Sequence, residues 1–338
     1  MLRILHRAAD KHLWEWNDPE AVMRIPELIA TPETLTWIDL TDDGSHGNDE
    51  LRRALETLLR DLLHYHPLAV EDVLTEASTP RVDDWGEYLY VVLHAVRWDV
   101  ALEQVDTAEL DVFLGYNYLI TYRSEPIPSV DKLWKALLRD ERHTRRGSDY
   151  VLYEIADALA TDYMPCMDAM DDALDRMEDE IFDRPSNLTL ARIFKLKSAV
   201  LNLRRVLSPQ REVMTRLARD EFAVIDVRER VYFRDVYDHL VRLVDINESL
   251  RDLVSGALET YLSVTANRTN DVMKTMTIFT MLFSPLAVIT GFFGMNFFAE
   301  SIVVQTVFSP NMLFGAMLTL MISVPVLLLV FIRRRGWV

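Results

Sequence analysis

The residues whose types and spacing could do chemistry gather between positions 270 and 296, where polar oxygens recur along an otherwise apolar stretch. Three hydroxyls, those of Thr277, Thr280 and Ser284, stand three and four residues apart, which places them on one face of a helix. Neutral oxygens of this kind can contact a cation or its hydration water, but they do not form a nucleophile–base pair. The stretch therefore does not indicate the making and breaking of bonds, and its polar face is expected to contact protein or water.

Motifs for other chemistry are absent from the sequence. It contains no G-x-x-x-x-G-K-[ST] phosphate loop, no H-E-x-x-H zinc pair and no G-x-S-x-G nucleophile elbow. Cys166 is the only cysteine, so neither an intrachain disulfide nor a cysteine metal cage is possible. His64 and His66 suggest a metal site, but without a periodic cluster around them we interpret them as an ordinary helix terminus. We expect the protein not to be an enzyme.

Two uncharged runs, residues 277–298 and 311–332, are each long enough to cross a hydrocarbon core about 30 Å thick as a helix. The connection between them is short, so the two runs form a hairpin whose ends lie on the same side of the membrane. Lys274 precedes the first run and Arg333, Arg334 and Arg335 follow the second, whereas residues 297–310 contain no basic residue. The positive-inside tendency then places both termini in the cytoplasm of a multi-pass inner (plasma) membrane protein.

The first run differs from a plain anchor because its small and polar residues share a face. Such residues face protein or water rather than lipid. Pro285, Gly291 and Gly294 weaken a helix, yet membranes tolerate them where freed carbonyls are buried or line a cavity. We predict that this face lines a pore; the alternative is a structural hairpin with ordinary helix-packing residues. The predicted pore-lining residues are Asn270, Met273, Met276, Thr277, Thr280, Ser284, Ala287, Val288 and Gly291.

Several blocks together resemble the CorA family of divalent-cation (magnesium/cobalt) channels. They are YFRDVYDH at 232–239, NDVMK at 270–274, Pro285, GMNF at 294–297 and the basic tail RRRGW at 333–337. The resemblance covers nearly the whole chain and is clearest from about residue 149 onward. It implies a homopentamer whose selectivity filter is Gly294, Met295 and Asn296. A ring of Asn296 amide oxygens would bind hydrated Mg²⁺ without stripping its water; the alternative is that Asn296 caps the span.

The resemblance also implies that Mg²⁺ bound between neighbouring cytoplasmic domains regulates the channel. Asp72 and Asp235 match the family's positions for this ion, and Glu71 and Asp157 are further candidates. The alternative is that both aspartates form salt bridges with surface arginines. We expect Mg²⁺ as the regulatory and the transported ion, with Co²⁺ and Ni²⁺ as companions, and no organic cofactor.

The chain departs from the family pattern after Phe297. It reads Phe-Ala-Glu-Ser where the best-known branch has Met-Pro-Glu-Leu, so that Glu300 alone is left to attract ions outside. The cation preference is therefore open. A zinc transporter of the same superfamily is one alternative function, and a non-conducting, membrane-anchored metal sensor or metalloenzyme is another. We call Lys274 and Arg333 to Arg335 the basic collar. Membrane anchoring explains these residues, and the alternative is a role at the cytosolic mouth of the channel.

Hydrophobic periodicity predicts an α+β fold that is mainly helical. Strands are expected at 35–41 and 88–97 and on both sides of a turn at 115–117, with helices at 49–64, 67–75, 129–142, 149–182 and 188–219. One helix from about 230 to 296 would join stalk and pore. The predicted parts are an α/β subdomain (1–145), an acidic helical hairpin (146–229), the stalk (230–276), the first span (277–298), an extracytoplasmic loop (299–310), and the second span with its tail (311–338).

Charge is distributed unevenly along the chain. Residues 1–271 carry 52 of the 53 carboxylates but only 32 of the 36 basic residues. A domain this acidic does not favour nucleic acid as a partner. The partners we expect are further copies of the chain, the lipid bilayer and divalent cations. Most individual carboxylates, including the run between 168 and 180, are interpreted as a solvated face.

Overall fold

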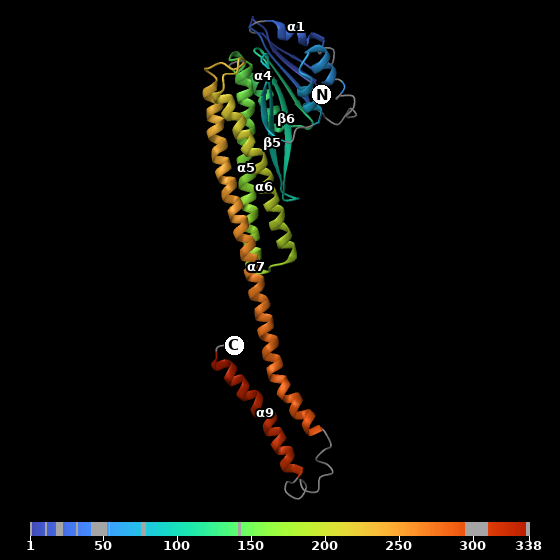
Figure 1. Ribbon diagram of the computed structural model, residues 1–338, viewed down its shortest axis with the longest axis vertical. Coiled ribbons are helices and arrows are strands. Elements are labelled where there is room, and N and C mark those ends of the chain that lie inside the picture. Colours follow the sequence, from blue (N-terminus) through green and yellow to red (C-terminus); the bar gives the residue numbers. More distant parts are fainter. Residues whose placement is uncertain are drawn as a thin grey trace. The chain divides into compact units, whose positions relative to one another are not determined.

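The computed structural model of the single chain describes residues 2–10, 12–17, 23–31, 33–41, 53, 55–75, 79–140, 143–294 and 310–335. The chain divides into two compact units, Met1–Glu259 and Thr260–Val338. The first unit contains a sheet with helices on both faces, and the second contains two apolar helices (Figure 1).

The described residues of the first unit form a seven-stranded sheet in the order β2-β1-β3-β7-β6-β5-β4. Neighbouring strands pair antiparallel, except that β3 and β7 pair parallel. The strands are β1 (Leu2–Arg7), β2 (Leu13–Trp16), β3 (Leu35–Thr41), β4 (Arg81–Asp84), β5 (Leu89–Asp99), β6 (Gln104–Leu114) and β7 (Tyr118–Arg123). Residues 89–96 of β5 are all buried, because both faces of the sheet are covered there.

One face of the sheet packs against short helices. These are α1 (Ile25–Ala30), the π-helix η2 (Thr57–Leu62) and α3 (Pro67–Thr75). Their apolar residues, among them Leu58, Leu59 and Val70, form the main core cluster with Ile38, Val92 and others from the strands. This cluster fixes α3, which carries Glu71 and Asp72, at its place beside the sheet.

The opposite face contacts longer helices: α4 (Pro128–Arg139), α5 (Ser148–Asp183) and α6 (Asn187–Arg219), with a short 3₁₀ turn, η3 (His143–Arg145), before α5. Trp134 of α4 lies 4.8 Å, centroid to centroid, from Trp37 of β3, whose indole N–H donates to Thr121. Ser186 lies in the turn between α5 and α6 and caps α6 by accepting the N–H of Thr189 at 3.2 Å.

A buried ion network lies beneath α4. The Asp39 side chain is fully buried and accepts from Arg3 at 2.8 Å and Arg123 at 3.0 Å, and Thr121 donates to its other oxygen at 2.6 Å. Arg3 and Arg123 also bind Asp131 of α4, at 2.7 and 2.6 Å. Each charge is therefore matched by partners from a different element, as a buried charge requires.

Helix α7 runs without interruption from Arg230 to Gly294, and α9 runs from Pro310 to Arg334. In the first unit α7 buries one stripe spaced alternately three and four residues apart, the coiled-coil interval. The stripe is Phe233, Val236, Leu240, Leu243, Asn247, Leu250, Val254 and Ala257. Leu253 lies outside this stripe, because it is 50% exposed and the neighbouring Val254 is buried.

The other predicted elements compare with the structure as follows. The strand at 35–41, the helix at 67–75, the turn at 115–117 and the long helix from 230 are confirmed, the last as far as Gly294. Of the helix predicted at 49–64, residues 49–52 and 54 lie outside the described residues, and residues 55–62 are helical. From Thr57 to Leu62 the helix is a π-helix, in which the Leu63 N–H bonds to the Leu58 C=O. This wider turn keeps Leu55, Leu58 and Leu59 all buried. Strands β1, β2 and β4 were not predicted.

Candidate ion pathway and metal sites

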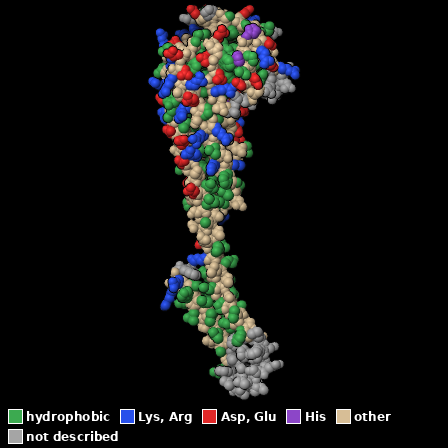
Figure 2. Space-filling view, in the orientation of Figure 1, with side chains coloured by type: hydrophobic (Ala, Val, Ile, Leu, Met, Phe, Trp, Pro, Cys, Tyr) green, Lys and Arg blue, Asp and Glu red, His purple; other side chains and the backbone are tan. Residues whose placement is uncertain are grey.

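The described membrane segment consists of two helices long and apolar enough to cross a bilayer, within α7 and within α9. Their most apolar 18-residue windows have mean hydropathies of 1.6 and 2.5, and almost none of either window is buried within the chain. Hydrophobic side chains cover the visible face of both helices (Figure 2). Exposed apolar surface on this scale needs lipid or further protein to cover it.

All nine predicted pore residues lie on α7, and all nine are exposed in the single chain. At 3.6 residues per turn they fall within an arc of about 120°. Phe279 and Phe283, on another face, are also exposed and stack at 5.3 Å between centroids. Exposure in one chain therefore does not distinguish a pore face from a lipid face, and the assignment of the pore face stays a prediction.

Two of the hydroxyls on the predicted pore face, those of Thr277 and Thr280, donate hydrogen bonds within α7. Thr277 donates to the Met273 carbonyl at 2.8 Å, and Thr280 donates to the Met276 carbonyl at 2.9 Å. Since each hydroxyl proton is used within the helix, the oxygen lone pairs are left to accept from water or to contact a cation. Pro285 has no N–H, which also leaves the Met281 carbonyl without its usual helical donor. This part of α7 is thus rich in oxygen acceptors.

A groove of about 730 Å³ runs along this same face. Five predicted pore residues line it: Met273, Met276, Thr277, Thr280 and Ser284. Leu328 of α9 closes one side of it, which places the C-terminal part of α9 beside the N-terminal part of the span in α7. The two helices therefore form the hairpin that the sequence predicts.

The basic collar and Gly294, the one described residue of the predicted filter, lie at the ends of these helices. Lys274 lies on α7, and Arg333 and Arg334 end α9 with Arg335 directly after it; all four side chains are exposed. Gly294 is the last residue of α7, and nothing lies within 4 Å of the position where a Cβ would stand. Met295, Asn296 and Glu300 lie outside the described residues, so the filter geometry stays a prediction.

The four predicted regulatory carboxylates fall into two groups. Asp72 of α3 pairs with Arg81 of β4 at 2.6 Å, and Glu71 on the same helix is exposed. In contrast, Asp157 of α5 and Asp235 of α7 interact electrostatically across the α5–α7 seam. Within the described residues no three His, Cys, Asp or Glu side chains converge as a ready metal cage. A metal site built from these carboxylates therefore needs oxygens from water or from a second chain.

Electrostatics distinguish Asp157 from a simple surface carboxylate. Burial, together with the negative charges of Asp235 and Glu154, raises its pKa, and nearby His239 opposes the rise. An ionised pair at this position is unfavourable without a cation, and hard oxygen ligands are what Mg²⁺ binds. The carboxylates around Asp157 fit a divalent cation, with His239 as the nearby group that competes with it, whereas Asp72 is paired with Arg81.

Of the aromatic and basic residues around this seam, Tyr232 and Phe233 belong to the block at 232–239 noted in the sequence, whereas Arg146, Tyr150 and Tyr153 were not singled out. Arg146 lies between the rings of Tyr150 and Tyr232, 4.2 and 4.4 Å from their centroids, and binds Glu229 at 3.1 Å. Tyr153 packs edge-on against Phe233 at 6.5 Å. These contacts hold the start of α7 against α5. The recurrence of aromatic residues in the first turns of α5 and α7 was the sequence signal that could have predicted this contact.

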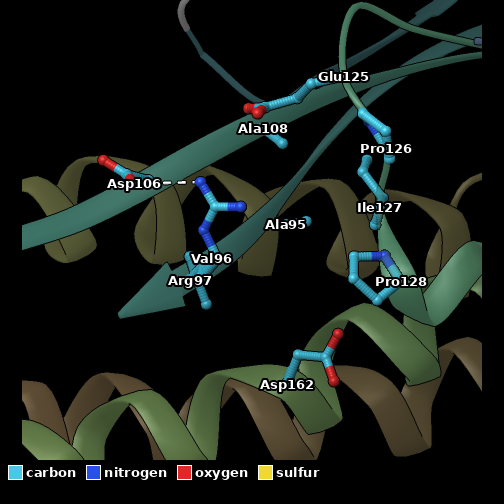
Figure 3. Close-up of a pocket in the computed structure, with 10 residues that line it drawn as sticks. All are labelled: Ala95, Val96, Arg97, Asp106, Ala108, Glu125, Pro126, Ile127, Pro128 and Asp162. Atoms are coloured by element: carbon cyan, nitrogen blue, oxygen red, sulfur yellow. Dashed lines mark hydrogen bonds and ion pairs between the residues drawn. The ribbon is translucent and has the colours of Figure 1, made fainter. Parts of the chain in front are cut away.

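A second acidic group surrounds a small cavity of about 40 Å³ between β5, β6 and α5. Asp106, Glu125 and Asp162 line it, and Arg97 pairs with Asp106 at 3.3 Å. Figure 3 shows Glu125 and Asp162 on opposite sides of the cavity, with Ile127 and Pro128 beside it. These carboxylates do not converge, so we assign no metal site to them.

With the fold and these sites described, the family can be decided. Residues 32–334 match the model of the CorA-like Mg²⁺ transporter protein family. The chain is a member of the CorA family. It is 34% identical over 287 residues, 83% of this chain and 77% of the relative, to the cobalt/magnesium transport protein CorA of Thermotoga maritima. It is also 24% identical over 277 residues, 80% of each protein, to the zinc transport protein ZntB of Yersinia enterocolitica.

The CorA fold is shown by a solved structure as well. The complete structure of the CorA magnesium transporter from Methanocaldococcus jannaschii matches with a TM-score of 0.79 at 20% identity, covering 99% of this chain and 98% of that one. The resemblance and the α+β, mainly helical fold predicted from the sequence are thereby confirmed. The chain is a CorA-family divalent-cation transport protein of a membrane.

Proposed function

We propose that five copies of this CorA-family chain form a channel for inward movement of divalent cations, with Mg²⁺ as the main ion and Co²⁺ or Ni²⁺ as companions. The observation that carries the proposal is the exposed, acceptor-rich face of α7 that leads to Gly294 of the Gly-Met-Asn segment. One hairpin cannot enclose a pathway, so closed rotational symmetry is needed to surround one. Both termini then lie on the cytoplasmic side of the inner membrane.

The driving force is the membrane potential. Moving a divalent cation inward across 100 mV releases about 4.6 kcal/mol. No nucleotide-dependent step is needed for uptake, in agreement with the lack of a phosphate-loop motif in the sequence. We propose conduction rather than catalysis for this reason.

Selection takes place at residues 294–296. Mg²⁺ is small, prefers octahedral oxygen coordination and gives up water reluctantly. A ring of Asn296 amide oxygens, with backbone acceptors made accessible by Gly294, would bind the hydrated ion. Neutral oxygens bind it weakly enough for release.

Gating follows from the cytoplasmic carboxylates. Asp157 and Asp235 repel each other when no cation is present, and bound Mg²⁺ would cancel this repulsion and favour the closed assembly.

The test is Asp72→Asn/Asp235→Asn, with the exposed Asp168→Asn/Asp172→Asn of α5 as the charge-matched control. The double variant should lose Mg²⁺-dependent protease protection and inhibition by internal Mg²⁺, while the control keeps both. Wild-type protection and inhibition in the double variant would exclude these aspartates as the sensor.

The proposed function is tested with the purified full chain in liposomes that contain an Mg²⁺-sensitive dye. An inside-negative potential should drive dye-reported uptake, and collapsing the potential should stop it. The similarity to ZntB supports a second candidate, zinc transport, which the same liposomes test with Zn²⁺ under a pH gradient. Uptake of Zn²⁺ but not Mg²⁺ would favour that candidate. If no divalent ion produced a response, the protein would be a non-conducting metal sensor or metalloenzyme.

A further inference from the structure

The C-terminal end of α9 joins an apolar helix face to a group of basic residues. The second unit, residues 260–338, contains five Lys and Arg residues but only two carboxylates, Asp271 and Glu300, although the chain as a whole carries a formal charge of −17. Three of the five are consecutive, at 333–335. Basic side chains gather at this end of α9 next to hydrophobic ones (Figure 2). The local charge here is therefore positive.

Arg333 and Arg334 are cations without a counterion. Both side chains are exposed, and neither forms an ion pair with any residue that the structure describes. Arg335 lies 5.7 Å from the centroid of the Phe331 ring, so it contacts an aromatic side chain and not a carboxylate. The one carboxylate among the described residues of this unit, Asp271, is on α7. Two adjacent, exposed and unpaired guanidinium groups attract an anion from the surroundings.

The packing of α9 against α7 determines where these arginines stand. Leu328 lines the groove together with residues of α7, and Ile332 is only 1% exposed. Since the two residues are four positions apart, they share one face of the helix. This face of α9 packs towards α7, and it fixes the rotation of the last turn.

Arg334 stands on the opposite face of α9. At 3.6 residues per turn it lies about 200° around the helix from Ile332, and Leu327 and Val330 lie about 220° and about 160° from Ile332. Leu327 is 67% exposed and Val330 is 48% exposed. We call Leu327, Val330 and Arg334 the outer column of α9. It consists of exposed apolar side chains that end in an unpaired cation.

The outer column has the same order of polarity as a phospholipid. At about 1.5 Å per residue, Val330 lies about 6 Å and Leu327 about 10 Å along the helix axis before Arg334. An acyl chain can pack along Leu327 and Val330 while the phosphate of the same lipid lies at the guanidinium. Guanidinium groups match phosphate oxygens in both charge and donor geometry.

We propose that Arg333 and Arg334 bind the phosphate of an anionic phospholipid whose acyl chain packs along the outer column of α9. A soluble phosphate would leave Leu327 and Val330 uncovered, whereas a lipid covers them. A zwitterionic lipid has its own ammonium group beside the phosphate, which weakens the attraction to arginine. The proposal rests on α9 crossing the bilayer. It does not rest on the ion pathway, since neither arginine is a predicted pore, filter or regulatory metal residue.

The experiment measures the lipid preference of the full chain in phosphatidylcholine bilayers. Trace amounts of spin-labelled phosphatidylglycerol or spin-labelled phosphatidylcholine are added to both leaflets, and the immobilised fraction of each label gives the relative association constant of the two lipids. We expect phosphatidylglycerol to be favoured about fivefold at low salt, the factor that one basic residue contributes near an anionic surface, and less at about 0.5 M NaCl. Because no ion flux is measured, failure of the channel proposal would not affect the result.

Variants test the site itself. Arg333→Gln/Arg334→Gln should reduce the preference for phosphatidylglycerol to less than about twofold. Arg204→Gln/Arg205→Gln, which removes an adjacent pair of exposed arginines from α6 in the first unit, is the matched control and should keep the wild-type preference. Size-exclusion chromatography checks the assembly of each variant. If Arg333→Gln/Arg334→Gln does not assemble, Arg334→Glu decides, because it leaves the other basic residues in place and should also remove the preference.

A soluble competitor distinguishes a lipid site from a site for free phosphate. Glycerol 3-phosphate at millimolar concentration should leave the immobilised fraction of phosphatidylglycerol unchanged, because it has no acyl chain to pack along Leu327 and Val330. Displacement of the lipid by this competitor would overturn the proposal. So would an equal association of both lipids with the wild-type chain, or a preference that persists in the assembled arginine variants.

Discussion

The Arg81 guanidinium lies 2.6 Å from the Asp72 carboxylate, so a residue at a predicted regulatory metal position already has a cationic partner within its own chain. Arg81 also binds Asp83 at 3.2 Å and lies 5.6 Å from the centroid of the Tyr90 ring. The contact joins α3 to the edge strand β4. A cation that uses Asp72 must therefore displace Arg81 or share the carboxylate with it.

Replacing Arg81 with Gln tests this competition. Both side chains of the pair are about one-third or more exposed, 33% for Arg81 and 41% for Asp72, and such pairs contribute about 0–1 kcal/mol. If Asp72 is a ligand, Arg81→Gln should lower the Mg²⁺ concentration for half-maximal protease protection by about two- to fivefold. Arg60→Gln, which breaks the pair with Glu56, is the control. An unchanged midpoint in Arg81→Gln would count against Asp72 as a ligand.

Asp157→Asn should stabilise the cation-free protein. Burial raises the pKa of Asp157, with further contributions from Asp235 and Glu154, so the folded state disfavours its charge. In EDTA the wild-type protein should gain stability from this group as the pH falls through the raised pKa towards the ordinary carboxyl value of 3.8, and lose it as the pH rises through the raised pKa again. Asp157→Asn should raise the melting temperature at pH 7, flatten this pH dependence and reduce the stabilisation by Mg²⁺. A lower melting temperature in EDTA would contradict the assignment.

Asn296→Ala should abolish or severely reduce selective Mg²⁺ uptake while the assembly stays intact. The physical reason is the loss of the amide oxygen that we propose as a ligand to the hydrated ion. Dye-reported flux in liposomes and size-exclusion chromatography measure the two properties separately. Asn311→Ala, which removes an amide at the start of α9, is the matched control. Wild-type flux from a correctly assembled Asn296→Ala protein would exclude the filter role.

Cysteine substitution should identify the pore face of α7. Cys166 is buried, and burial raises the pKa of its thiol to about 12, so it reacts slowly; Cys166→Ala removes it from the background altogether. Thr277→Cys and Ser284→Cys should react with a small hydrophilic thiol reagent in open channels. Phe279→Cys and Phe283→Cys, on another face, should not. The reverse labelling pattern would mean that the phenylalanine face lines the pore.

Asp39→Asn should destabilise the first unit. The change removes the buried negative charge that Arg3 and Arg123 bind, and a buried pair broken in this way costs about 3–5 kcal/mol. We expect a fall in melting temperature of about 10 °C for the full chain in detergent. Asp106→Asn, at an exposed pair with Arg97, should change it by only a degree or two. Equal small effects from both would show that the network contributes little.

Local patterns account for what could be predicted from the sequence. The strand at 35–41, the helix at 67–75, the long helix from 230 and the hairpin of two spans follow from the period and length of apolar runs, which neighbouring residues specify. Strand β5 was predicted because it is rich in β-branched and aromatic residues. Strands β1 and β4 are short, and their sequences have no comparable signal. They become strands because the sheet provides pairing partners.

The blocks at 232–239, 270–274 and 294–297, together with the uncharged spans and the basic tail, were enough to predict the family from the sequence, and the family model confirms it. Only the tertiary structure decided that Asp72 pairs with Arg81 while Asp157 faces Asp235, because these contacts join elements that are separate in the sequence. The sequence determines the type of each side chain, but the burial of a side chain and the pairing of its charge depend on which elements pack together.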